Sequence, residues 1–275
     1  MVICDGGLWA MEADLWARVF WQNDSGGINQ YEDFWQVVAK NVKVYRNNVA
    51  ALDEDAVILE PRGADDGEKI RVPADVLVYC TGWSVLPSLF EDATASHIGL
   101  PSPLKEEDSA WKALDAKADV DTLSRFPGLM YPPSYRVKHS SYAPFRLYKT
   151  MAPISADFDR SVLFLGRLVT GNNFLLVEVQ ALWAVAYLDG HLQCSPAEMR
   201  WDVAKMVTWS RRRYLNKGWL GYWFFFDVVE YSDMLLAQMG LRSHRSSWRV
   251  PDALFPWRPK DLKGLLEEYK AKYPI

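Results

Sequence analysis

Between Asp75 and the pair Thr81-Gly82, the chain has a nearly unbroken run of apolar residues, 76–80. A strand with one face in water alternates apolar and polar side chains, whereas this run does not alternate. An unbroken run is typical of a strand that is covered on both faces, as in a parallel sheet flanked by helices. Residues 161–166 repeat the pattern, with an apolar stretch that ends at Gly166. The two runs therefore predict an α/β fold with buried strands.

Hydrophobic periodicity predicts the other elements. A strand is expected at 41–52, and residues 56–59 and 69–72 predict the two arms of a β-hairpin. Gly240 stands where the C-terminal cap of the last helix is expected. Helices are predicted at 8–21, 31–40, 111–123, 174–188, 198–214 and 222–239.

These elements divide the chain into two predicted parts. Residues 1–190 are expected to form an α/β core, which includes a proline-rich loop region at 91–160. Residues 191–275 are expected to form a mainly helical extension that packs on this core. Aromatic residues make up 14% of the chain, which excludes intrinsic disorder and favours a packed interior.

Charge and metal-ligand patterns exclude several classes of protein. The net charge is −4 and no basic stripe is present, so nucleic acid is not an expected partner. The triplet Arg211-Arg212-Arg213 is interpreted as a solvated helix face. The four histidines show no HxxxH or HExxH spacing, and the three cysteines form no CxxC pair, so no metal site is expected.

The same residues bear on the cellular compartment. Three widely spaced cysteines are typical of a reducing environment, so a cytoplasmic location is expected. The first ten residues lack the pattern of a signal peptide. The most apolar stretch, 174–188, contains Glu178 and Gln180 and is too short to span a bilayer, so it is expected to be a buried helix.

Three landmarks resemble a known family. Residues 74–83 (Ala-Asp-Val-Leu-Val-Tyr-Cys-Thr-Gly-Trp) resemble the motif of an aspartate, an apolar strand and Ala-Thr-Gly-Tyr in flavin-containing monooxygenases; Cys80 replaces the alanine and Trp83 the tyrosine. Residues 162–183 look like the family's last dinucleotide-domain strand and its following helix. The C-terminal tail is similar to the helical region of fungal members. The resemblance implies a flavoprotein fold with two dinucleotide-binding domains.

The glycine fingerprints of that family are absent from the sequence. In GxGxxG the glycines let backbone N–H groups and a helix N-terminus meet a pyrophosphate. Here Gly6-Gly7 is followed by Leu8-Trp9 instead of a third glycine. We therefore interpret the chain as a truncated remnant of the flavoprotein fold, equivalent to its C-terminal half. No cofactor is expected, and FAD with NADPH is the alternative.

The resemblance also implies where a site would lie. In the family, the Thr-Gly turn and the glycine after the last strand approach the flavin; a vacated flavin seat would leave an apolar cavity for a small apolar substrate. Predicted substrate-binding residues are Thr81, Gly82, Trp83, Tyr142, Thr170, Asn172 and Phe174. Predicted catalytic residues are Arg167, Asn173, His139 and Glu178, as hydrogen-bond donors to a carbonyl or as acid–base groups.

Each of these residues also has a purely structural interpretation. Asn172 or Asn173 is suited to an N-cap, and Glu178 lies early in the same helix, where the dipole favours a carboxylate. Arg167 is suited to an ion pair and His139 to a solvated loop.

Three functions remain open from the sequence. The first is a cofactor-independent isomerase or cyclase, with a pericyclic reaction among the candidates, because orientation alone accelerates a unimolecular cyclisation. The second is a flavin-dependent monooxygenase half that needs a partner chain. The third is a non-catalytic protein that binds a hydrophobic ligand. A homodimer is one arrangement that would cover the surface left by the missing domain.

Overall fold

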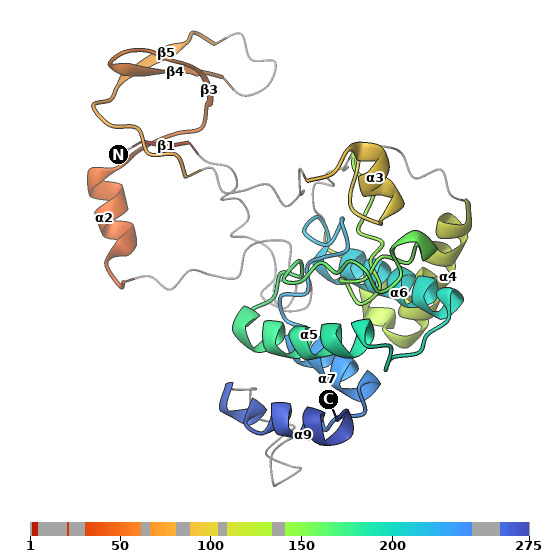
Figure 1. Ribbon diagram of the computed structural model, residues 1–275. Coiled ribbons are helices and arrows are strands. Elements are labelled where there is room, and N and C mark those ends of the chain that lie inside the picture. Colours follow the sequence, from red (N-terminus) through yellow and green to blue (C-terminus); the bar gives the residue numbers. More distant parts are fainter. Residues whose placement is uncertain are drawn as a thin grey trace. The chain divides into compact units, whose positions relative to one another are not determined.

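The computed structural model describes residues 2–4, 21, 31–61, 67–80, 89–103, 109–133, 141–243 and 259–274 (Figure 1). Contacts divide the chain into two compact units. Unit 1 comprises Met1–Ala13 and Gly27–Val85, and unit 2 comprises Asp14–Gly26 and Leu86–Ile275. The helix predicted at 8–21 lies outside the described residues except for Trp21.

Unit 1 contains a three-stranded antiparallel sheet in the order β3 (Asn48–Leu52), β4 (Ala56–Glu60) and β5 (Ile70–Pro73). Strands β4 and β5 pair from Ala56↔Pro73 to Leu59↔Ile70, which confirms the predicted hairpin. Apolar side chains on one face of the hairpin gather because alternate residues of a strand share a face. They are Val57, Leu59 and Val72.

A second pair of strands in unit 1 is parallel: β1 (Val2–Cys4) lies beside β2 (Lys43–Tyr45). The single strand predicted at 41–52 is therefore two strands, β2 and β3, that belong to different sheets. The predicted helix at 31–40 is confirmed as α2 (Phe34–Asn41), and none of its residues is buried.

The apolar run that suggested a buried strand is not a strand. Residues 75–80 have no strand pairing, and Val76, Val78 and Tyr79 are 78%, 73% and 69% exposed. Residues 161–166 also form turns and irregular backbone. A strand covered on both faces needs neighbours, and the strands in the described part of the chain pair among themselves. The prediction of two buried strands is therefore wrong here, while the mixed helix and strand content stands.

Unit 2 is mainly helical. Short helical segments are α3 (Asp92–His97), η1 (Pro127–Met130), η2 (Ala156–Phe158) and η3 (Pro259–Leu262). The longer helices are α4 (Ser109–Arg125), α5 (Asn173–Leu188), α6 (Pro196–Tyr214), α7 (Val228–Gln238) and α9 (Leu265–Lys272). Helices predicted at 111–123, 174–188 and 198–214 are thus confirmed as α4, α5 and α6.

The core of unit 2 is centred on α5, whose buried residues recur at helical spacing and contact α7. Trp183 is fully buried, and its ring stacks on Tyr187 with centroids 5.1 Å apart. Helix α4 packs along α6 (Figure 1). The predicted boundary at residue 190 lies inside unit 2, and the predicted parts, an α/β core at 1–190 and a helical extension at 191–275, stay predictions.

The last predicted helix begins later than expected. Residues 222–226, Tyr-Trp-Phe-Phe-Phe, precede α7 and are not helical. Its end agrees with the prediction: Gly240 has a φ of +62°, and Gly240 and Leu241 donate their N–H groups to the carbonyls of Ala237 and Leu236. This is the pattern of a glycine C-terminal cap.

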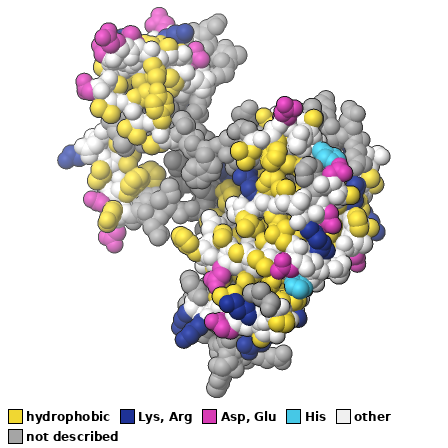
Figure 2. All heavy atoms as spheres, viewed as in Figure 1, with side chains coloured by type: hydrophobic (Ala, Val, Ile, Leu, Met, Phe, Trp, Pro, Cys, Tyr) yellow, Lys and Arg dark blue, Asp and Glu magenta, His cyan; other side chains and the backbone are white. Residues whose placement is uncertain are grey.

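None of the helices in the described ranges is both long and apolar enough to cross a membrane. Hydrophobic side chains are nevertheless visible on the surface of both units (Figure 2).

The start of α6 makes a pH-dependent contribution to stability. Ser195 Oγ accepts a hydrogen bond from the Glu198 N–H, and the Glu198 carboxylate accepts one from the Ser195 N–H at 2.9 Å. The serine hydroxyl also donates to this carboxylate at 2.7 Å, and these bonds lower the pKa of Glu198 below 4.5. A lowered folded-state pKa gives stability that is present above pH 4.5 and lost as the pH falls below it.

We therefore expect Ser195→Ala to flatten the loss of stability between neutral pH and acid. The measurement is urea unfolding, followed by circular dichroism, at a series of pH values. Ser124→Ala is the control, because Ser124 Oγ donates its hydrogen bond to the backbone carbonyl of Asp121 in its own helix, and not to a carboxylate. An unchanged pH slope in Ser195→Ala would contradict this assignment.

Candidate functional site

Four predicted site residues fall outside the described ranges. They are Thr81, Gly82, Trp83 and His139. The seven others are described, and their proposed roles in binding or catalysis stay predictions.

Four predicted residues lie in the segment that leads into α5. Thr170 is buried, and its Oγ1 donates a hydrogen bond of 2.9 Å to Asn173 Oδ1. Asn172 is the N-cap: its Oδ1 accepts from the Leu175 N–H at 3.4 Å. Arg167 precedes them in the sequence, in irregular backbone. The N-cap interpretation of Asn172 is thus the one that the geometry supports, because a cap satisfies a helix N–H that has no partner inside the helix.

This turn is held by a segment that sequence reasoning missed. Val169 N–H donates to Tyr222 O, and Phe224 N–H donates back to Val169 O, both at 2.9 Å. Gly171 N–H donates to Phe225 O at 2.9 Å. Five successive aromatic residues, 222–226, fit neither helical nor strand alternation. This loss of periodicity is the sequence signal that residues 222–226 are not helical, although the predicted helix at 222–239 includes them.

Arg167 lies beside a pair of aromatic rings. Its guanidinium carbon lies 5.3 Å from the centroid of Phe145, whose ring packs against Tyr222 at 5.7 Å. Burial lowers the pKa of Arg167 below its usual value, and the charge of Tyr222 partly opposes this shift. An arginine on an aromatic surface is suited to hold a planar, electron-rich group.

A buried hydrogen-bond network lies behind the turn. Gly166 N–H donates to Gln180 Oε1 at 3.1 Å, and Gln180 Nε2 donates to the Tyr231 hydroxyl at 3.1 Å. That hydroxyl donates to Lys149 O at 2.6 Å, and burial raises the pKa of Tyr231 to about 12. Tyr231 therefore stays a neutral donor near pH 7 and ties α7 to α5.

The remaining predicted residues do not converge on this turn. Phe174 is 90% exposed, Glu178 is exposed and Tyr142 is half-buried. An aromatic ring that is so exposed encloses no cavity in this unit. No group of three or more His, Cys, Asp or Glu side chains suited to hold a metal ion occurs among the residues that the structure describes.

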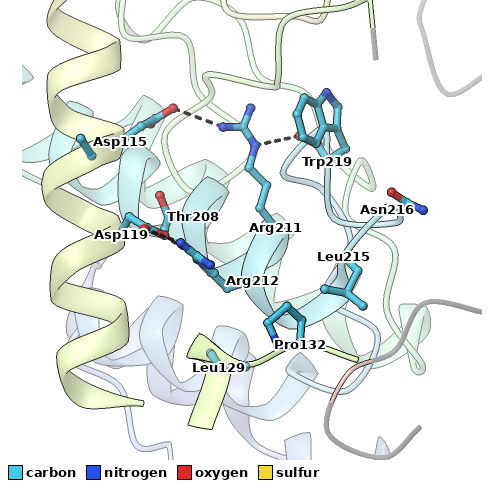
Figure 3. A pocket seen from close by; sticks show the side chains of 11 residues that line it. Asp115, Asp119, Leu129, Pro132, Thr208, Arg211, Arg212, Leu215, Asn216 and Trp219 are labelled. Carbon is cyan, nitrogen blue, oxygen red and sulfur yellow. Dashed lines mark hydrogen bonds and ion pairs between the residues drawn. The ribbon is translucent and has the colours of Figure 1, made fainter. Parts of the chain in front are cut away.

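A separate cleft lies between α4 and the C-terminal end of α6 (Figure 3), with a volume of about 390 Å³. Its polar lining comes from both helices and the turn that follows α6. Its apolar lining comes from η1 and the adjacent loop, with further residues from α4 and from the turn that follows α6. The residues are Asp115, Ala116, Asp119, Leu129, Pro132, Thr208, Arg211, Arg212, Leu215, Asn216 and Trp219.

Ion pairs join the two walls of this cleft. Arg212 contacts Asp119 through two hydrogen bonds of 2.6 and 2.5 Å. Arg211 contacts Asp115 at 3.4 Å, and its Nε donates to Trp219 O at 3.1 Å. Arg211 and Arg212 are half-buried and pair with carboxylates on α4, so they are not simply the solvated helix face that the sequence suggested. These acids are about ninety residues away in sequence, where no spacing pattern could link them.

Comparison with curated proteins finds fungal FAD-dependent monooxygenases. The chain is 29% identical over 261 residues to an FAD-dependent monooxygenase of Aspergillus nomiae, which covers 92% of this chain and 44% of the relative. It is 28% identical over 262 residues to one of Fusarium langsethiae and over 265 residues to one of Aspergillus sclerotiorum, again with 92% and 44% coverage.

These matches confirm the resemblance stated from the sequence. The chain spans less than half the length of the curated relatives that it matches. No family model matches the chain. No solved structure matches it.

Proposed function

From the similarity to FAD-dependent monooxygenases, we propose that this chain supplies one part of such an enzyme. In this proposal it binds FAD only when a segment that carries a GxGxxG fingerprint docks on unit 1. The observation that carries the proposal is the exposed apolar run at residues 75–80, with Val76, Val78 and Tyr79 each more than two-thirds exposed. Exposing such apolar side chains to water is unfavourable in free energy, whereas covering them within a sheet is favourable.

The occupant of this surface is an α/β segment with a free edge strand. Strand pairing with residues 75–80 satisfies their backbone groups and covers Val76 and Val78. The relatives contain such a length of chain, because this sequence matches only 44% of the Aspergillus nomiae protein.

By itself the chain does not fit FAD. The sequence has no GxGxxG, and the start of α5 is closed by Asn172, which accepts the Leu175 N–H that a phosphate would need. Gly166, with a φ of +68° and open space where a Cβ would stand, is suited to a close approach by a ligand. One such glycine is not a dinucleotide seat, so no reaction step through the flavin is derived for this chain alone.

The test uses two preparations. The first is the chain alone, incubated with FAD and desalted. The second is the chain co-expressed with the part of the Aspergillus nomiae relative that lies outside the matched 261 residues. We expect flavin absorbance to remain with the second preparation only. Retention of FAD by the chain alone, or no complex in the second preparation, would contradict the proposal.

A charge in the exposed run should block docking. We expect Val78→Lys to prevent co-purification of the two segments, because a lysine inside a covered strand buries an unpaired charge. Val120→Lys is the matched control: Val120 is 70% exposed on α4 in unit 2, close to the 73% of Val78. Gel filtration followed by flavin absorbance measures both. Equal complex formation by the two variants would show that residues 75–80 are not the contact.

The cofactor-independent isomerase or cyclase is the second candidate. Missing glycine fingerprints and the well-packed interior of unit 2 favour it. It predicts turnover of a small apolar substrate by flavin-free protein, with loss of activity in Arg167→Gln or Asn173→Ala. Activity that requires added flavin excludes it.

A further inference from the structure

The outer side of α5 carries exposed apolar side chains. Helix α5 is apolar almost all round, because Asn173, Glu178 and Gln180 are its only charged or amide side chains. A helix of this kind is normally buried on every side. One side of α5 is buried in the core of unit 2, but the other side is exposed, and Figure 2 shows hydrophobic side chains over this helix.

The exposed apolar residues form one continuous stripe along the helix, here called the α5 stripe. They are Phe174, Val177, Ala181, Val185 and Leu188. Spacings of three and four residues keep them on one face, because an α-helix has 3.6 residues per turn. Glu178 lies at one edge of the stripe, where its carboxylate stays in water when the stripe is covered.

The α5 stripe has the same spacing in both directions along the helix. Ala181 is its centre; Phe174 and Leu188 flank it at equal distances in sequence, and so do Val177 and Val185. If two copies pack antiparallel about a two-fold axis at Ala181, Phe174 of one copy lies opposite Leu188 of the other. Val177 then lies opposite Val185. An interface between identical copies requires this kind of self-complementarity.

The centre and the ends of the stripe favour the same arrangement. The small side chain of Ala181 lets two helix axes approach closely where they cross. Antiparallel packing places the negative end of each helix dipole beside the positive end of the other. Asp189, the exposed C-cap residue of α5, then lies level with Asn173 of the second copy, at a helix N-terminus that stabilises a carboxylate.

We propose that two copies of this chain associate through their α5 stripes, antiparallel, with the two-fold axis at Ala181. The proposed function places the other segment of the monooxygenase on unit 1, whereas the α5 stripe belongs to unit 2 and complements itself. The four larger side chains of the stripe expose on the order of 400 Å² per copy, about half of the roughly 800 Å² that each partner buries in a stable interface. The dimer is therefore weak, with a dissociation constant on the order of 100 μM.

Sedimentation velocity of the purified full chain measures this association. The protein concentration runs from well below the expected dissociation constant to several times above it. We expect the 31.5 kDa monomer to convert into a species of twice its mass. Because sedimentation separates species by size, larger aggregates are counted apart from the dimer.

A charge at the centre of the stripe should prevent dimer formation. Ala181→Lys places two like charges against each other at the two-fold axis, so we expect the dimer to weaken at least about tenfold. Ala113→Lys is the matched control: Ala113 is an exposed alanine of α4, outside the stripe, and this variant should stay within about twofold of the unchanged chain. Circular dichroism shows whether each variant retains the fold.

A cross-link tests the position of the axis. Two cysteines at position 181 lie within disulfide reach of each other in the proposed dimer, whereas two at position 113 do not. Copper phenanthroline as oxidant should therefore cross-link Ala181→Cys and leave Ala113→Cys monomeric. Both variants also carry Cys80→Ser, which removes an exposed native thiol.

A concentration-dependent dimer that is lost in Ala181→Lys, retained in Ala113→Lys and cross-linked at position 181 supports the proposal. A monomer at all concentrations, an unchanged dimer in folded Ala181→Lys, or equal cross-linking at positions 181 and 113 overturns it. None of these measurements involves FAD or a second segment, so their outcome is separate from the test of the proposed function.

Discussion

Replacing Gly218 by alanine is expected to lower the free energy of unfolding by about 3 kcal/mol. A Cβ at this position would lie well inside contact distance of the main-chain carbonyl of Ser210, and 2.9 Å from its Oγ. Ser210 is fully buried in α6, so its carbonyl can move only if the helix moves. Gly218 N–H also donates to the carbonyls of Tyr214 and Leu215, which fixes the turn after α6. Urea unfolding at pH 7 measures the loss.

A second glycine provides the control for this prediction. Gly264 has a φ of +81°, but a Cβ there would meet no atom within 4 Å. Gly264→Ala should therefore cost only the left-handed backbone conformation, about 1 kcal/mol. Equal losses in the two variants would mean that backbone conformation, and not the clash with Ser210, sets the requirement at Gly218.

Replacing Arg146 by leucine is expected to lower the free energy of unfolding by about 3 kcal/mol. The side chains of Arg146 and Asp115 are only 7% and 19% exposed, and they form two hydrogen bonds. Leucine leaves the Asp115 carboxylate with the long Arg211 contact. It also removes the guanidinium from the ring of Trp111, where it lies 4.3 Å from the centroid. Thermal and urea unfolding measure the effect.

The cause of this loss can be separated by a double variant. Arg146→Leu combined with Asp115→Leu removes both charges, so it should be more stable than Arg146→Leu alone. Arg125→Leu should cost only about 0.5 kcal/mol, since its pair with Asp121 is exposed. If the double variant is no more stable than the single one, the uncompensated charge of Asp115 is not the source of the loss.

Local signals in the sequence predicted the helices of unit 2. Gly240 provides a cap that needs only its own backbone freedom. The capping box of Ser195 and Glu198 is an equally local signal, and the predicted start at residue 198 did not use it. Helix α5 follows from apolar residues at helical spacing. Each of these signals depends only on residues that are close together in the chain, so it can be read directly from the sequence.

Contacts between distant residues explain the errors. Residues 75–80 have the composition of a central strand, but a strand also needs partners, and sequence patterns do not say whether partners are present. In the cleft, Asp115 contacts an arginine 31 residues away and another 96 residues away. No spacing rule covers such distances, so the cleft was absent from the predicted site.

At the start of α5, two of the predicted site residues make hydrogen bonds only a few residues along the chain. The sequence predicts Asn172 and Thr170 as ligand contacts, whereas in the structure both make short-range hydrogen bonds that organise the turn. Arg167 differs from them, because Phe145 and Tyr222 come to it from other parts of unit 2. Among the described residues that were predicted to be catalytic, Arg167 is therefore the one whose surroundings come from distant parts of the chain.

The exposed run at residues 75–80 has a consequence for handling the protein. A short segment of β-branched and aromatic residues, with one acidic residue at its start, is the type of sequence that stacks into cross-β aggregates. Pro73 and Asp75 flank it on one side only and act as gatekeepers there. Chains that lack a covering segment will accordingly compete between correct pairing and self-association, and the yield of soluble protein will fall as the expression level rises.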